Sequence, residues 1–130
     1  MLKDISRKGG SMETILIVDD EKKVRNIYRR LLQDEGFKVL EAENAVKAKW
    51  LLESEHVDVM LLDINMPEIT GDVLYEIARI FNRDVKIIVT SVYPVNYQKE
   101  KIEGAVEYFD KSEGLKVLIE KVKKVIQGDS

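Results

Sequence analysis

The chain of 130 residues contains no cysteine, one histidine and two prolines. Without cysteine it can form no disulfide and use no thiol in catalysis, which fits a reducing cytoplasm, where we expect the protein to act. We expect no zinc site, because His56 has no second histidine and no cysteine to join it. We also expect no membrane span, because no apolar run approaches the roughly 20 residues that cross a bilayer.

The chain also lacks an excess of positive charge. It has 21 Lys and Arg residues against 24 Asp and Glu residues, a formal net charge of -3. The chain has no net positive charge that would attract nucleic acid, so we expect no direct nucleic-acid binding by this domain. The length suits one folded domain, which we place at residues 13–127. Residues 1–12 are polar and predict a flexible tail or an added leader, and residues 128–130 form the C-terminal end.

From residue 14 onward, short apolar runs alternate with segments of helical period. Strands are expected at 14–18, 37–42, 57–62, 85–89 and 105–109. Helices are expected at 21–35, 44–54, 72–81 and 115–126, and a segment of weak helical period runs from Pro94, in the first turn of a helix, to Glu103. This alternation predicts an α/β fold: a doubly wound, five-stranded parallel sheet between two layers of helices.

Ligands of such sheets bind beyond the carboxyl ends of the strands. The side chains at these ends are carboxylates, hydroxyls and one ammonium group, namely Asp19, Asp20, Asp63, Thr90, Ser91 and Lys111. Carboxylate oxygens suit Mg²⁺, with Mn²⁺ as a possible substitute. An ammonium and a hydroxyl beside such a cation match a phosphoryl group, and one carboxylate could act as its nucleophile.

Three of these positions also have an ordinary structural interpretation. Asp20 could cap the first helix, Asp63 could be a loop residue before a proline turn, and Lys111 could be a solvated charge. Taken alone, the Asp pair is more typical of a helix cap than of a metal site. The combination of all three positions favours the phosphoryl site.

These residues stand in motifs that resemble the receiver domains of response regulators in two-component signalling, over residues 14–127. The motifs are the Asp-Asp pair at 19–20, DINMPEITG at 63–71, Thr90, Gly104-Ala105 and YFDK at 108–111. The resemblance implies a flavodoxin-like sheet with strand order 2-1-3-4-5.

The resemblance also implies roles for single residues. Asp63 would be the phosphoacceptor, taking a phosphoryl group from a phosphohistidine on a sensor histidine kinase or phosphotransfer protein. Mg²⁺ would be bound by the carboxylates of Asp20 and Asp63, by the backbone carbonyl of Asn65 and, through water, by Asp19.

Lys111 and Thr90 would contact the phosphoryl group. Thr90 and Tyr108 would form a switch that alters the face made by the helix after Pro94, the strand at 105–109 and the last helix. That face would contact an effector protein or a fused output domain, or form a dimer. The domain is therefore expected to signal and not to act as an enzyme, beyond slow Mg²⁺-dependent autophosphorylation and autodephosphorylation.

Two other functions would use part of the same pattern. A Mg²⁺-dependent phosphatase or phosphotransferase for small molecules would share the aspartyl nucleophile, but Asn65 stands where a second Asp would supply the acid or base. A nucleotide or flavin module is disfavoured, because no Gly-rich phosphate loop follows the first strand.

The sequence departs from the receiver pattern after Lys111, where Ser112 replaces the usual proline, often behind a cis peptide. The Lys111–Ser112 bond is therefore left open between cis and trans. Residues 92–103 are expected to be mobile or reshaped. The group formed by Lys121, Lys123 and Lys124 predicts a solvated helix face.

Overall fold

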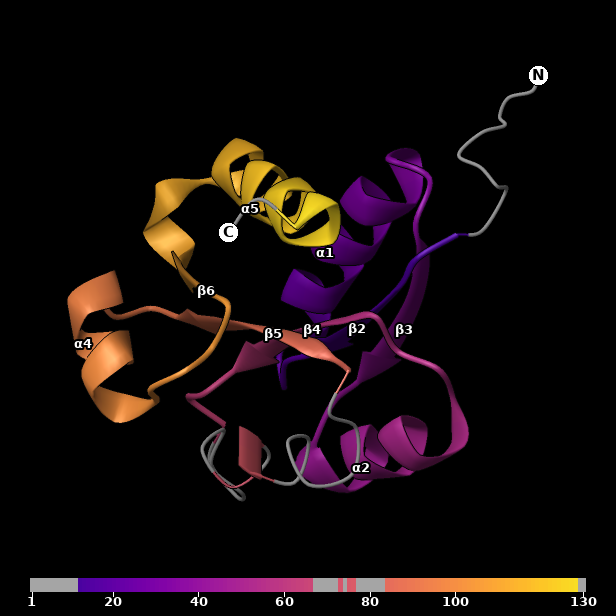
Figure 1. Cartoon of the computed structure of the whole chain (residues 1–130), viewed down its shortest axis with the longest axis horizontal. Helices are drawn as coiled ribbons and strands as arrows, with labels where there is room; N and C mark the ends of the chain where they lie inside the picture. The colour runs from indigo at the N-terminus through magenta and orange to yellow at the C-terminus, as the bar shows by residue number, and fades with distance from the viewer. Residues whose placement is uncertain (1–11, 67–72, 74, 77–83, 129–130) are drawn as a thin grey trace.

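The computed structural model of the chain describes residues 12–66, 73, 75–76 and 84–128 (Figure 1). Its strands are β2 (Thr14–Val18), β3 (Lys38–Ala42), β4 (Val59–Asp63), β5 (Lys86–Ser91) and β6 (Glu107–Asp110). They form one parallel sheet in the order β3-β2-β4-β5-β6, which is the order 2-1-3-4-5 along the chain. The predicted five-stranded, doubly wound sheet is confirmed.

The central strands are buried along almost their whole length. All five residues of β2 and all five of β4 are buried, as are the last five of β5. Uninterrupted apolar runs are typical of parallel strands that are covered on both faces. β3 lies at the edge of the sheet, and four of its five residues are exposed or half-buried.

Helices cover both faces of the sheet. α1 (Lys22–Asp34) and α5 (Leu115–Gln127) lie on one face, α2 (Ala45–Ser54) lies on the other, and α4 (Val95–Lys101) lies beside β6 (Figure 1). A short 3-10 helix, η1 (Lys111–Glu113), links β6 to α5. The predicted three-layer arrangement is therefore confirmed.

Two clusters of buried side chains form the core, one on each face of the sheet. Ile15 and Ile17 of β2 pack with α1 and α5, whereas Leu16 and Val18 pack with α2. This division follows from the alternation of side chains along a strand. The helical period of residues 115–126 matches the face of α5 that packs on the sheet: Leu118, Val122 and Val125 are buried, although Leu115 is exposed.

The ends of the elements agree with the sequence to within two residues. The helix predicted from Glu21 begins at Lys22, with Glu21 at the N-cap. The helix predicted from residue 44 begins at Ala45, and Asn44 caps it, since its side chain accepts a hydrogen bond of 2.9 Å from the N–H of Lys47. Gly128 ends α5 in the left-handed conformation, with φ of 81°.

The helix predicted after Pro94 is shorter than expected. Pro94 precedes the first turn with an extended ψ of 154°, and the helix ends at Lys101. Within α4 only Gln98 is buried, which explains why the sequence shows no apolar period there. The predicted loop after Met66 lies outside the described residues. Most of the helix predicted at 72–81 also lies outside them, although Val73, Tyr75 and Glu76 are helical.

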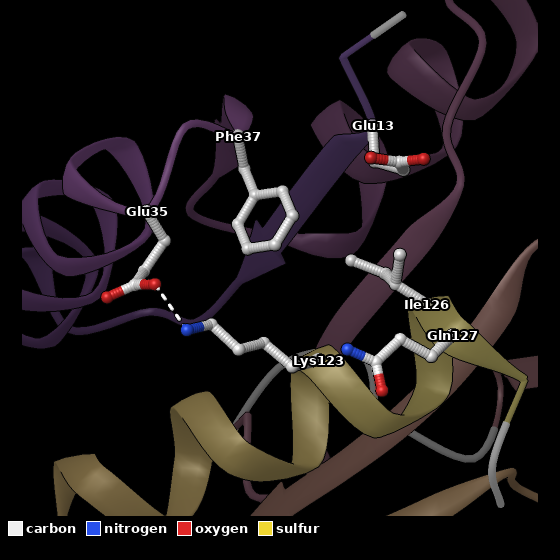
Figure 2. A pocket seen from close by; sticks show the side chains of 6 residues that line it. All are labelled: Glu13, Glu35, Phe37, Lys123, Ile126 and Gln127. Carbon is white, nitrogen blue, oxygen red and sulfur yellow. Dashed lines mark ion pairs between the residues drawn. The ribbon is translucent and has the colours of Figure 1, made fainter. Parts of the chain in front are cut away.

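A hollow lies near the amino-terminal end of β2, away from the strand ends that carry the acidic residues (Figure 2). It is lined by Glu13, Glu35, Phe37, Lys123, Ile126 and Gln127. The ammonium group of Lys123 lies 2.6 Å from a carboxylate oxygen of Glu35, so this ion pair joins α5 to the end of α1. Across the described part of the chain, every helix is too short or too polar to cross a bilayer.

We predict that Leu118→Ala lowers the free energy of unfolding by about 2–5 kcal/mol, because it leaves a cavity between α5 and the sheet. Leu118 is fully buried, whereas Leu115 in the same helix is 42% exposed. Leu115→Ala is the matched control and should change that free energy by about 0.5 kcal/mol or less. Denaturant unfolding measures both variants. Equal losses in the two variants would contradict the packing described for α5.

Candidate functional site

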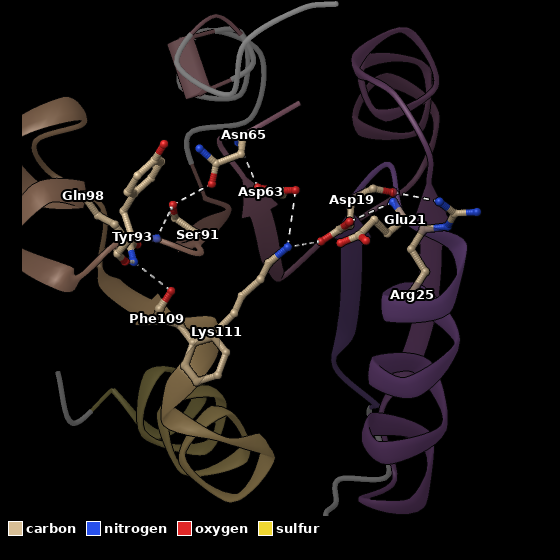
Figure 3. A network of polar contacts seen from close by, with 10 residues as sticks. All are labelled: Asp19, Glu21, Arg25, Asp63, Asn65, Ser91, Tyr93, Gln98, Phe109 and Lys111. Atoms are coloured by element: carbon tan, nitrogen blue, oxygen red, sulfur yellow. Dashed lines mark hydrogen bonds and ion pairs between the residues drawn. The ribbon is translucent and has the colours of Figure 1, made fainter. Parts of the chain in front are cut away.

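The strand register brings the predicted site residues to one rim. Val18 pairs with Leu62, so the residues that follow them, Asp19 and Asp63, end neighbouring strands. Asp63 pairs with Thr90 on the next strand. Lys111 comes directly after the last residue of β6 and reaches the same rim (Figure 3).

Three carboxylates gather at this rim. Oxygen atoms of Asp19, Asp20 and Asp63 all lie within 4.8 Å of one another. Asp19 is 1% exposed and Asp63 is 3% exposed, whereas Asp20 faces solvent. Buried carboxylates at such separations repel one another and need cations or hydrogen-bond donors to compensate them.

The ammonium group of Lys111 is the cation that the structure supplies. Its Nζ lies 2.9 Å from Oδ2 of Asp19 and 3.4 Å from Oδ2 of Asp63 (Figure 3). Burial acts to lower the pKa of Lys111, but the hydrogen bond to Asp19 and the charges of Asp63 and Asp19 outweigh it, so the pKa is raised. Lys111 therefore stays protonated and bridges two strands.

The environment of Asp63 disfavours the charged form of its carboxyl group. Burial raises its pKa above the ordinary value, against the opposing effects of Lys111 and of the Asn65 N–H, which donates a hydrogen bond of 2.8 Å to Oδ1. Burial together with the nearby carboxylates also raises the pKa of Tyr28 to about 12. The rim is thus short of positive charge around Asp63.

Asp19 is held by its own turn and by α1. Its Oδ1 accepts a hydrogen bond of 2.9 Å from the N–H of Glu21. Its backbone carbonyl accepts one of 2.8 Å from the guanidinium of Arg25, which also lies 3.3 Å from Glu41 of β3. Arg25 is not among the site residues predicted from the sequence, because its partners are a backbone carbonyl and a residue of another element.

A capping box presents Lys111. The side chain of Asp110 accepts hydrogen bonds from the N–H and the hydroxyl of Ser112, and Glu113 accepts one from the N–H of Asp110. The Ser112 N–H and hydroxyl lower the pKa of Asp110. The Lys111–Ser112 peptide is trans, so this turn orients the lysine without proline.

Thr90 and Ser91 end β5 side by side, and both are buried. The hydroxyl of Ser91 donates a hydrogen bond of 2.6 Å to the side-chain oxygen of Asn65 and accepts one of 3.1 Å from the N–H of Tyr93. The predicted positions of Thr90 and Asn65 at the rim therefore agree with the structure, although their roles remain predictions.

Tyr108 points inward from β6 and is 6% exposed. Its hydroxyl donates a hydrogen bond of 2.6 Å to the carbonyl of Ile102 and accepts one from the N–H of Ala105. Lys121 of α5 donates a hydrogen bond to the Tyr108 carbonyl and lies 3.2 Å from a carboxylate oxygen of Glu113. The prediction of a solvated Lys121 is therefore wrong, because its ammonium group fastens α5 to β6.

The donor set of the acidic cluster suits a hard divalent cation. Its ligand atoms are carboxylate oxygens, and neither nitrogen nor sulfur is among them. Asp20 faces solvent and can bind such an ion together with water molecules. Both oxygens of Asp19 accept hydrogen bonds, from the Glu21 N–H and from Lys111, and both oxygens of Asp63 do so from the Asn65 N–H and from Lys111.

The doubly wound α/β sheet, with an acidic site and a lysine at its carboxyl rim, is the arrangement that the resemblance to receiver domains implies. The family model for the response regulator receiver domain matches residues 15–123. The chain therefore belongs to the receiver domains of two-component response regulators, which are signalling domains.

Individual relatives agree with this assignment. Sporulation initiation phosphotransferase F of Bacillus subtilis is 27% identical over 116 residues, which cover 88% of this chain and 94% of that protein. Response regulator UvrY of Escherichia coli is 38% identical over 125 residues, but these cover 90% of this chain and only 56% of UvrY.

A solved structure of response regulator TrrA from Thermotoga maritima, in complex with Mg²⁺ and BeF, has a TM-score of 0.79 and 37% identity. The match covers 87% of this chain and 98% of that chain. A second structure holds TrrA in complex with the histidine kinase ThkA.

We predict that Asp63→Asn raises the free energy of unfolding at pH 7 by about 1 kcal/mol or more, because it removes a buried charge. The pKa of Asp63 is raised in the folded state, so the stabilisation by its protonated form is lost as pH rises through that pKa. The advantage of the variant should therefore shrink as pH falls toward the unfolded value near 4.

Denaturant unfolding between pH 4 and pH 7 measures this difference. The matched control is Glu53→Gln, which removes the charge of an exposed carboxylate and should change the free energy of unfolding by about 0.5 kcal/mol or less. A wild-type protein more stable than Asp63→Asn at pH 7 would contradict the environment described for Asp63.

Proposed function

We propose that this domain accepts a phosphoryl group on Asp63 from a phosphohistidine of a partner protein in the cytoplasm. The observation that carries the proposal is the contact of Lys111 with both Asp19 and Asp63 inside the acidic cluster. This arrangement holds a buried carboxylate that is only partly compensated, beside an ammonium group that can bind phosphoryl oxygens.

In the proposed reaction, a carboxylate oxygen of Asp63 attacks the phosphorus of the phosphohistidine. The oxygen–phosphorus bond forms as the phosphorus–nitrogen bond breaks, and the bonding pair returns to the imidazole, which takes up a proton. Lys111 and the hydroxyl of Thr90 then donate hydrogen bonds to the new phosphoryl oxygens. The N–H of Asn65 keeps the Asp63 side chain oriented toward the rim.

Mg²⁺, or Mn²⁺ in its place, fits the donor set, with Asp20 and Asp63 as direct ligands, the Asn65 carbonyl as a third and Asp19 through water. When bound, this cation neutralises charge that develops on the transferred phosphoryl group. Its support here is the cluster of carboxylate oxygens and the Mg²⁺ in the TrrA structure.

The proposed partners follow from the relatives. A sensor histidine kinase or a phosphotransfer protein would supply the phosphoryl group, as the complex of TrrA with ThkA suggests. Thr90 and Tyr108 would act as the switch that alters the face of α4, β6 and α5 toward an effector, an output domain or a second copy. The match covers only 56% of UvrY, so a link between this domain and an output domain is itself a proposal.

We expect incubation with acetyl phosphate and Mg²⁺ to add one phosphoryl group to the wild-type protein, as measured by intact-protein mass spectrometry. Asp63→Asn should show no gain. The matched control is Asp58→Asn, which changes an aspartate at the opposite end of β4 and should be labelled like the wild type. Labelling that persists in Asp63→Asn would assign the phosphoryl group to another residue.

The same proteins can be used to distinguish a receiver domain from a Mg²⁺-dependent phosphatase or phosphotransferase. A receiver should take up one phosphoryl group and release it slowly, because Asn65 supplies an amide where a phosphatase would need an acid or base. Sustained turnover of a small phosphomonoester, many times the protein concentration, would favour the Mg²⁺-dependent phosphatase or phosphotransferase instead.

We predict that Asp20→Asn weakens Mg²⁺ binding at least about tenfold, because it removes a charged oxygen ligand. Asp20 faces solvent, so the variant should remain folded. Isothermal titration with MgCl₂ measures the affinity. Asp34→Asn, at the exposed end of α1, is the control and should bind Mg²⁺ like the wild type. Equal affinities in all three proteins would remove Asp20 from the ligand set.

A further inference from the structure

Gln98 is a polar residue at a position where a short surface helix would normally place an apolar one. It is the buried residue of α4, with 0% of its surface exposed, whereas its neighbours Tyr97 and Lys99 face solvent. A helix that covers a sheet buries its apolar side. An amide in that place costs free energy unless its hydrogen bonds are made.

The Gln98 amide group joins two segments of the fold. Its nitrogen donates a hydrogen bond of 2.8 Å to the carbonyl of Tyr93, between β5 and α4, and one of 2.9 Å to the carbonyl of Phe109 in β6 (Figure 3). Both amide hydrogens are therefore used, which fixes the orientation of the group. α4 is tied through this residue to the segment that precedes it and to β6.

The amide oxygen of Gln98 has no such partner. It is buried and accepts no hydrogen bond from the part of the chain that the structure describes. A buried acceptor without a donor is unfavourable, so a shift of α4 that gives this oxygen a donor or a water molecule recovers free energy. Two hydrogen bonds from the Gln98 nitrogen therefore stabilise the position of α4, whereas the unpaired Gln98 oxygen destabilises it.

A continuous set of hydrogen bonds leads from the rim to Gln98. The N–H of Asn65 donates to Asp63, and the Ser91 hydroxyl donates to the Asn65 side chain. The N–H of Tyr93 then donates to the Ser91 hydroxyl, and the Tyr93 carbonyl accepts from Gln98 (Figure 3). Each link joins atoms at hydrogen-bond distance, so displacement of one link shifts the next.

We propose that Gln98 is a positioning residue that couples the rim around Asp63 to α4. The role of this coupling in signalling rests on the proposed phosphorylation of Asp63. A phosphoryl group there rearranges Asn65 and Ser91, and the Tyr93 segment carries this change to the Gln98 amide. The coupling itself is a property of the fold and can be measured without any ligand.

The first experiment uses the ligand-free protein and nitrogen-15 NMR. We expect Ser91→Ala to shift the side-chain amide resonances of Gln98 and the backbone amide resonances of α4. In the Gln98→Met background the Ser91→Ala shifts at α4 should be lost, because the link is missing. The control Asn96→Met, on the exposed side of the same helix, should leave them in place. Shifts that simply add in the double variant would overturn the proposal.

The second experiment adds Mg²⁺ and beryllofluoride, a mimic of the phosphoryl group. In the wild type the amide resonances of Lys111 and of α4 should both shift. In Gln98→Met the shift at Lys111 should persist while the shift at α4 is lost. An unchanged response of α4 in that variant would refute the coupling role.

The two proposals fail in different ways. If the wild-type rim does not respond to Mg²⁺ and beryllofluoride, the proposed function is wrong, and the ligand-free experiment still decides the role of Gln98. If Gln98→Met does not fold, Gln98→Ala takes its place, because it also removes both donors and puts no charge against the Tyr93 and Phe109 carbonyls. A purely structural role would lower stability in both variants and leave the responses of α4 intact.

Discussion

The contact of the Lys111 ammonium group with Asp19 and Asp63 is the interaction on which the rim depends. Two charges 4 Å apart interact by about 4 kcal/mol at the dielectric typical of a protein surface, so carboxylates on neighbouring central strands would strain the sheet without it. One ammonium group cannot neutralise three carboxylates, and the cluster keeps a formal charge of -2. This charge matches the divalent cation that we propose for the site.

A common backbone device supports this arrangement at three strand ends. Asp19, Asp63 and Asp110 follow or end β2, β4 and β6, and each accepts a hydrogen bond of 2.8 or 2.9 Å from the N–H two residues later. Such turns lead the chain out of the sheet and fix the side chain in one step. Two of the turns aim carboxylates at the rim. The third, at Asp110, instead begins the 3-10 helix that directs Lys111 toward them.

Sequence reasoning succeeded where periodicity or topology decides. The buried runs of β2 and β4 and the stripe of α5 follow from spacing, and parallel strands necessarily gather their carboxyl ends at one rim. It failed where a polar group is placed by tertiary contacts. Arg25 and Lys121 bind backbone carbonyls of other elements, and Gln98 replaces the apolar residue by which α4 could have been recognised. Such contacts depend on the register of the strands, which pattern alone does not specify.

The two sides of the rim are held with different strength. On the side of β2, Arg25 joins the Asp19 carbonyl to the carboxylate of Glu41 by charge-assisted bonds, which are about twice as strong as neutral ones. On the side of β5 and α4, the links through Ser91 and Gln98 are neutral, and one oxygen of Gln98 is buried without a donor. If Asp63 is phosphorylated as proposed, the added charge acts on both sides, and we expect the weaker side to move first. We therefore expect the conformational change to run toward α4 and β6, away from α1.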